Sequence, residues 1–344
     1  MKEPRSAPIY SPLWKKLYSL IHEFVKTKPW ELFENEDVFY VQSPHGPQLY
    51  LCSVMGNAGE EFGLSAFRGD QGIRNYYSMI TREEYETPRN LIYELDMLSF
   101  TLGARDFMEK KDLQITKKLL LSFQGGNWPL IRSYRPHYAP WFLTESEIEV
   151  LCDCIEQTLA LYDEGEDVLE QIRNNENGDM LLRSFQNSSW VSTRRPVLYP
   201  AKEEAPAIHL DDFTAQRLRN LPDNGLKEEI DLVHLPGIIT DHEPFYFGLL
   251  LVGINEQKVN QYSLVKPFED YFEQACKILA QSFLKRGSKP CMVLLNAKSL
   301  FSKVFERIAA QADIRCEMAD ELPYITDFEN SMLDKLNGNE FDLR

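Results

Sequence analysis

Residues 125–141 read GGNWPLIRSYRPHYAPW, and the rest of the chain is organised around this stretch. It combines two tryptophans, two tyrosines, two arginines and three prolines with a glycine pair, and it has neither helical nor strand periodicity. A strand-rich segment precedes it and an acidic helix follows it. We therefore predict a non-repetitive segment that closes a first domain and covers the edge of its sheet.

Length and composition limit the classes of protein. With 344 residues the chain is too long for one ordinary core, so we expect two domains. A hydrophobic fraction of 43% and a charged fraction of 26% are typical of a globular chain. The net charge of −16 argues against a protein that binds the phosphate backbone of nucleic acids.

The six cysteines show no CxxC pair and no zinc-ligand spacing, and most lie in apolar patterns. We expect them to be reduced and buried, as in a cytoplasmic protein. The sequence has no apolar leader segment and no run of 18 apolar residues. It therefore predicts neither a signal peptide nor a membrane span.

Residues 1–165 are expected to form the first domain. An amphipathic helix is predicted at residues 11–27 and a second at Thr144, where Glu147 completes a capping box. Three short apolar and aromatic runs, separated by turn sequences, predict an antiparallel three-stranded meander at residues 37–43, 48–55 and 62–67. The pattern then loosens, and the run PAKEEAPA favours a connecting segment over residues 166–206.

Residues 207–344 are expected to form the second domain. After a short helix, three strands form a meander, and a helix, a strand, a helix, a strand and a last helix follow. This order is the strand plan of a ribonuclease H-like mixed sheet. The fold class is therefore α+β, with two domains that each begin with an antiparallel meander covered by helices.

The organising stretch also holds the candidate binding residues, which are Trp128, Arg132, Arg135, Tyr138 and Trp141. Arginine among aromatic side chains can stack on a ring and still offer a planar fork to a carboxylate or phosphate. Aromatic residues and arginine are also the composition of binding hot spots. The competing interpretation is a structural cap in which the arginines pair with the protein's own acids.

A metal site is the alternative. Ribonuclease H-like nucleases hold two divalent metals with acids from the first strand, the first helix, the end of the fourth strand and the last helix. On that plan the sequence offers Asp231, Glu269 and Asp327, but the fourth strand ends in Asn296. No other catalytic motif is present, so the sequence predicts no cofactor and favours a protein without intrinsic catalysis.

Four segments carry a resemblance to a known family. They read KPWELFENEDVFYVQSP, YLCSVMGNAGEEFGLSAFRG, FQGGNWPLIRSYRPHYAPWFLTESE and, in the second half, KPCMVLLNAKSLFSKVFERIAAQADIRCEMADELPYITDF. They resemble the two domains of an uncharacterised bacterial family, both of which are known as domains of unknown function. The resemblance implies the two-domain layout and a bacterial cytosolic setting, and it implies no catalytic residues.

The sequence thus predicts a cytoplasmic interaction or ligand-sensing protein without catalytic activity. Its partner would be a protein or a small ligand rather than nucleic acid or a membrane, and the sequence leaves homodimer formation open. The alternative is a divergent metal-dependent nuclease or phosphoesterase acting through Asp231, Glu269 and Asp327. A cluster of carboxylates around one metal position would distinguish the two.

Overall fold

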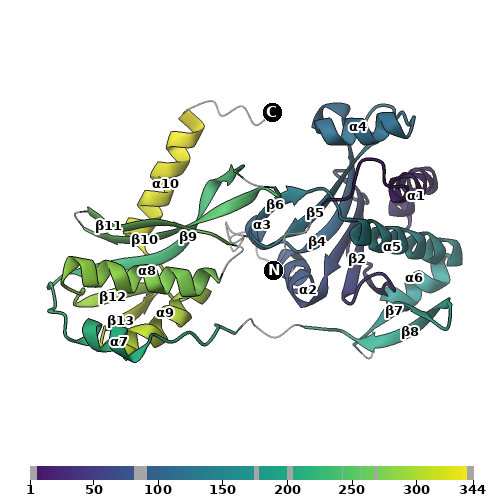
Figure 1. The fold of residues 1–344 in the computed structure, drawn as a ribbon. Helices are drawn as coiled ribbons and strands as arrows, with labels where there is room; N and C mark the ends of the chain where they lie inside the picture. The colour runs from purple at the N-terminus through teal and green to yellow at the C-terminus, as the bar shows by residue number, and fades with distance from the viewer. Residues whose placement is uncertain are drawn as a thin grey trace. The chain divides into compact units, whose positions relative to one another are not determined.

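The computed structural model describes residues 6–80, 91–173, 178–199, 204–241, 243–256, 258–267 and 270–338 (Figure 1). The chain divides into two compact units, Met1–Pro200 (unit 1) and Ala201–Arg344 (unit 2). Both units are built from strands and helices, so the predicted α+β class is confirmed.

Unit 1 has one mixed sheet. Its strand order is β6-β5-β4-β3-β2-β1-β7-β8, and every neighbouring pair is antiparallel except β1 and β7. The predicted meander is confirmed as β1, β2 and β3. The strands are β1 Phe39–Gln42, β2 Leu49–Met55, β3 Phe62–Arg68, β4 Met97–Gly103, β5 Trp128–Arg135, β6 Tyr138–Trp141, β7 Asp179–Gln186 and β8 Ser189–Pro196.

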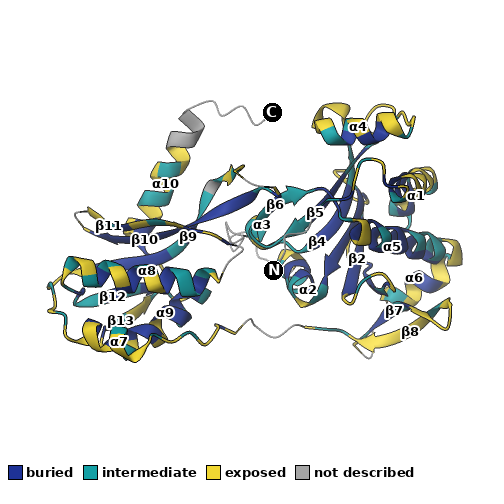
Figure 2. Cartoon of the chain, in the orientation of Figure 1, coloured by how far each residue is buried: buried dark blue, intermediate teal, exposed yellow. Residues whose placement is uncertain are grey.

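Helices cover both faces of this sheet. Alternate residues of a strand point to opposite faces, and the two sets enter two separate cores. The larger core holds α1 (Leu13–Thr27) and α5 (Glu145–Glu164), which pack against each other, together with α6 (Glu166–Arg173). The smaller core holds α2 (Gly69–Ile80) (Figure 2). The short elements are η1 Pro29–Glu31, α3 Leu91–Glu94, η2 Arg105–Phe107 and α4 Lys110–Lys118.

The segment expected to connect the domains is largely folded in unit 1. It contains α6 and the β7–β8 hairpin, and β7 adds to the sheet in parallel with β1. The polar sequence at residues 187–188 forms the hairpin turn, where Asn187 and Ser188 both have positive φ. The pairing of β7 with β1 joins residues about 140 positions apart, so local composition does not reveal it.

Unit 2 has the predicted element order. Its sheet runs β11-β10-β9-β12-β13, with β9, β10 and β11 antiparallel to one another and β12 parallel to both β9 and β13. This is the ribonuclease H-like strand arrangement, as predicted. The elements are α7 Asp212–Arg219, β9 Lys227–Ile239, β10 Tyr246–Asn255, β11 Lys258–Val265, α8 Tyr271–Arg286, β12 Met292–Asn296, α9 Leu300–Gln311, β13 Cys316–Ala319 and α10 Pro323–Gly338.

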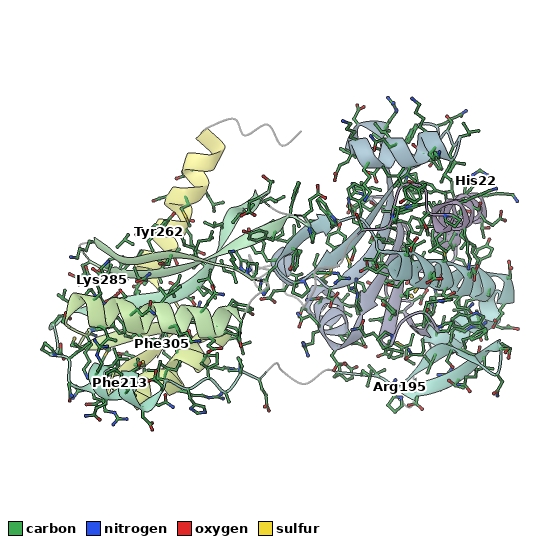
Figure 3. The ribbon with its side chains drawn as sticks, in the orientation of Figure 1. His22, Arg195, Phe213, Tyr262, Lys285 and Phe305 are labelled. Atoms are coloured by element: carbon green, nitrogen blue, oxygen red, sulfur yellow. The ribbon has the colours of Figure 1, made fainter. Side chains whose placement is uncertain are left out.

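Helix α10 is the element that positions the candidate site of unit 2. Helices α7, α8 and α9, including the buried Phe305, belong to the main core, whereas α10 packs on the other face of β9 and β10 (Figure 3). There Tyr262 of β11 lies with its ring centroid 5.9 Å from that of Phe328. The buried Glu229 of β9 accepts the backbone N–H of Ile325 at 3.0 Å, which fixes the start of α10 on the sheet.

All six cysteines are free. Four are buried and Cys291 and Cys316 are half-buried. None of the helices in the described ranges has the length and apolar content that a membrane crossing requires.

Candidate functional site

The organising stretch forms a β-hairpin rather than a non-repetitive segment. Strands β5 and β6 pair across a tight turn in which His137 has φ 68°. The three prolines and the register shift between Ser133 and Arg135 conceal the alternation expected of strands. The candidate residues therefore lie on the two last strands of the unit 1 sheet.

Arg132 points into unit 1 and is only 4% exposed. Its guanidinium binds both oxygens of Asp112, with Nη1–Oδ1 at 3.0 Å and Nη2–Oδ2 at 2.8 Å. It also donates to Glu109 Oε1 at 2.8 Å and lies over the ring of Phe142, 4.6 Å from the centroid. This arginine thus anchors α4 to β5, as the competing interpretation of a structural cap requires, and it offers no free fork to a ligand.

Arg135 takes part in a second buried ion cluster around Glu147. Its Nη2 donates to Glu147 Oε1 at 2.8 Å, and Arg68 Nη2 lies 3.1 Å from the same oxygen. The Ser133 hydroxyl also donates to it at 2.8 Å. Burial opposes ionisation, but Arg68 and Arg135 outweigh it and lower the pKa of Glu147 to about 2. Glu147 is therefore a carboxylate at neutral pH.

Glu147 has a local task as well. Its other oxygen, Oε2, accepts the backbone N–H of Thr144 at 2.8 Å, and the Thr144 hydroxyl accepts the N–H of Glu147 at 3.3 Å. The predicted capping box is thus confirmed. Because the same side chain binds two arginines from the sheet, the start of α5 is tied to β3 and β5.

The aromatic candidates are only half-buried. The Trp128 ring packs on Phe123, with ring centroids 5.5 Å apart. The guanidinium of Arg105 lies over the Trp128 ring, with Cζ 5.6 Å from the ring centroid. Trp141 meets Phe142 edge-on at 5.6 Å, and Tyr138 begins β6. With Arg135, which is 31% exposed, these three side chains keep part of their surface accessible to solvent.

In unit 2, the structure describes two of the three acids of the metal hypothesis. Glu269 lies outside the described residues. Asp327 is exposed on α10, and it adds to the effect of burial in raising the pKa of Glu229. Of the two described acids, Asp231 is the buried one, and it lies on β9, the first strand of the unit 2 sheet along the chain.

The neighbours of Asp231 come from three elements. Its Oδ1 accepts the Ser299 hydroxyl at 3.0 Å and the backbone N–H of Leu232 at 2.8 Å, and Asn296 hydrogen-bonds the same carboxyl. Burial and, to a smaller extent, the charge of Glu329 on α10 raise its pKa to about 6 against these hydrogen bonds. Asp231 thus has no cationic partner among these neighbours.

Two residues near Asp231, Glu329 and Ser299, were not predicted from the sequence. Glu329 and Asp327 are two residues apart on a helix, so they point in different directions. The apolar spacing of Leu322, Ile325 and Phe328 marks the inward stripe, and Glu329 is one turn beyond Ile325 on that stripe. Ser299, which precedes α9, carries no signal that distinguishes it from an ordinary helix cap.

The donors that the structure describes around Asp231 do not suit two divalent metals. Two-metal catalysis needs several carboxylates that converge on shared metal positions. Here an amide and a hydroxyl stand beside Asp231, and Glu329 is the one further acid that shifts its pKa. Within the described ranges, no group of three or more His, Cys, Asp or Glu side chains could hold a metal ion.

Comparison with known proteins identifies both halves of the chain. Residues 14–183 match the family model described as "Domain of unknown function (DUF7309)", and residues 214–333 match "Domain of unknown function (DUF6930)". Two domains of unknown function thus follow one another along the chain, as the sequence resemblance implies. No curated protein matches the sequence.

Solved structures add little to what the strand order of unit 2 already indicates about its fold. The chain is similar to the HTLV-2 integrase catalytic core domain in complex with magnesium, at 14% identity and a TM-score of 0.23, over 36% of this chain and 79% of that one. It is also similar to a chain of the simian T-cell lymphotropic virus intasome in complex with PP2A regulatory subunit B56 gamma, at 15% identity and a TM-score of 0.24, over 37% and 46%. Likenesses of this size carry no argument about metal or function.

Proposed function

We propose that this chain of two domains of unknown function is a non-catalytic interaction or ligand-sensing protein. The observation that carries the proposal is the surroundings of Asp231. The fourth strand of the ribonuclease H-like sheet ends in Asn296, and Ser299 donates to the carboxylate that a metal would need. The sheet order of unit 2 supports the scaffold, and among the described residues Asp231 has too few neighbouring acids for the nuclease chemistry of that scaffold.

The contact surface that we propose is the exposed part of the β5–β6 hairpin. Trp128, Arg135, Tyr138 and Trp141 present two indoles, a phenol and a guanidinium on neighbouring strands. Such large, rigid side chains supply most of the binding energy in many interfaces. Arg132 supports this surface from below through Asp112 and is not itself a contact residue.

The first test measures metal binding. Mn²⁺ is titrated into the metal-free full chain by calorimetry, with Asp231→Asn, Glu329→Gln and Asp327→Asn variants alongside. We expect no saturable binding that depends on Asp231 or Glu329. Saturable binding that is lost in both of those variants but kept in Asp327→Asn would overturn the proposal. It would favour a divergent metal-dependent nuclease or phosphoesterase built on the observed acid pair.

The second test concerns the hairpin. The tagged full chain and its Arg135→Ala/Trp141→Ala variant are used to capture bound proteins and metabolites, which are compared quantitatively by mass spectrometry. We expect specific partners to be lost from the variant while its thermal unfolding shows that it is folded. Phe213→Ala, which changes an exposed ring in unit 2, is the control and should keep them. Unchanged capture by the hairpin variant would exclude this surface.

A further inference from the structure

Helix α4 and its flanks stand at one end of the strands of unit 1, with an outer side that is exposed (Figures 1 and 2). The outer side bears three lysines with large apolar residues at both ends. We call this set the α4 surface, and it comprises Phe107, Lys110, Lys117, Lys118, Leu120 and Leu121. Phe107 is 69% exposed and Leu120 is 92% exposed, which is unusual for residues of this size.

Two acids of this segment, the buried Asp112 and the 55% exposed Glu109, are paired with an arginine. Glu109 and Asp112 both bind Arg132, and each also forms half of the capping box that starts α4. Arg105, the neighbour of Asp106 in the sequence, carries the opposite charge. The three lysines therefore leave an unbalanced positive charge on the outer side of α4, on a chain whose net charge is −16.

Leu120 occupies a backbone position that favours glycine. It follows the C-cap of α4 with φ 56°, its N–H donates to Lys117 O at 3.2 Å, and the Leu121 N–H donates to Thr116 O at 2.9 Å. These two bonds define a Schellman motif, in which the left-handed residue is usually glycine. A side chain with a β-carbon is strained there, and this one packs on almost nothing. Neither backbone geometry nor core packing explains a leucine at this position.

We infer that the α4 surface binds an acidic segment of a partner polypeptide, with carboxylates along the lysines and apolar side chains at its two ends. The nine residues of α4, which lie between the two apolar contacts in the sequence, span ~13 Å along the helix axis. The positive charge of the lysines favours an acidic partner segment, and the exposed Phe107 and Leu120 favour a segment with apolar side chains at its two ends. None of the four residues of the hairpin surface belongs to the α4 surface, so the inference goes beyond the interaction proposed above.

A lipid surface fits these observations less well. A helix that lies in a membrane interface needs a free apolar face, but the apolar side of α4 is already used inside unit 1, where Ile115 is buried and Leu119 packs against the core. The net charge of the chain also repels an anionic bilayer, whereas a short acidic segment meets mainly the charges within about 10 Å.

The test uses a fluorescein-labelled peptide with six central glutamates and two leucines at each end, titrated with the full chain and followed by anisotropy. We expect salt-sensitive binding that weakens at least tenfold in Lys117→Glu/Lys118→Glu. The same peptide with lysines in place of glutamates should bind that variant more tightly than it binds the unmodified chain. Lys15→Glu/Lys26→Glu, which makes the same charge change on α1, should bind the acidic peptide normally.

Leu120→Gly separates binding from folding. Glycine relieves the left-handed backbone, so we expect weaker peptide binding with a melting temperature no lower than that of the unmodified chain. Failure of the acidic peptide to bind, or equal loss in both charge variants, would overturn the inference. Binding to phosphatidylglycerol vesicles without peptide binding would overturn it in favour of a lipid surface. Either failure leaves the hairpin experiment unaffected.

Discussion

Among the described residues, Glu147 of unit 1 and Asp231 of unit 2 are deeply buried carboxylates whose pKa values move far from the ordinary value, in opposite directions. Glu147 of unit 1 lies between Arg68 and Arg135, and its pKa falls to about 2. Asp231 of unit 2 is bound by a hydroxyl, an amide and a backbone N–H, and its pKa rises to about 6. Both are buried to a similar extent, so the nature of the neighbours decides the sign.

The difference has opposite consequences for stability against pH. Glu147 contributes stability above the ordinary carboxyl pKa of 4.5, and this contribution is lost as the pH falls through about 2. Asp231 favours the folded state below its ordinary pKa of 3.8, and that contribution is lost as the pH rises through about 6. Unit 1 uses a buried charge to join elements, while unit 2 carries a carboxylate that its own fold does not neutralise.

The largest expected effect comes from removing the charge of Glu147. Glu147→Gln removes one of the two carboxylates beside the buried Arg68, leaving Asp96 Oδ1 at 3.3 Å from Arg68 Nε, and it weakens the ties from α5 to β3 and β5. We expect a loss of about 3–5 kcal/mol in the free energy of unfolding at pH 7, measured on the full chain with urea. Glu149→Gln, which changes a more exposed acid on the same helix, should cost less than about 1 kcal/mol. Equal losses would mean that the arginine contacts of Glu147 contribute little.

Asp231→Asn tests the opposite case. The amide can still accept the bonds from Ser299 and Leu232 but carries no charge, so we expect unit 2 to become more stable at pH 7 by roughly 1–3 kcal/mol. The gain should vanish below about pH 4, where Asp231 is protonated in both states. Calorimetric unfolding at the two pH values measures this. A loss of stability at pH 7 would show that the carboxylate has a cationic partner.

Ser299→Ala removes the one side-chain hydroxyl that donates to Asp231. We expect a loss of about 0.5–1.5 kcal/mol in the free energy of unfolding. Because that hydrogen bond favours the ionised carboxyl, the pKa of Asp231 should rise above about 6 in the variant. Carboxyl ¹³C NMR titration reads the pKa directly. An unchanged titration curve would remove Ser299 from the site.

Arg135→Gln is expected to have the smallest effect on stability. Its guanidinium is partly exposed, and Arg68 remains to pair with Glu147, so we expect a loss of at most about 1 kcal/mol. Urea unfolding measures it. A loss as large as that of Glu147→Gln would place Arg135 in the core of the ion cluster and weaken its role as a contact residue.

Much of the fold could be predicted from the sequence because the signals were local. The meander of unit 1, the capping box at Thr144 and the strand order of unit 2 follow from apolar periodicity and turn residues within a few positions. The β5–β6 hairpin was missed because prolines and a register shift obscure its alternation. The sequence suggests possible strands near residues 180–185 and 190–199, but it does not show their pairing with β1, which is distant in sequence.

The sequence by itself determined the two-domain α+β plan, the acidic character of the chain and the residue types at each site, because these depend on composition and short-range patterns. Only the tertiary structure decided that Arg132 faces Asp112 and Glu109, that Glu329 rather than Asp327 lies near Asp231, and that Leu120 is left in solvent. The physical reason is that pKa, ion pairing and exposure depend on which side chains meet in space. These side-chain contacts depend on how strands pair and how each helix is rotated about its axis, which residues far apart in the sequence determine.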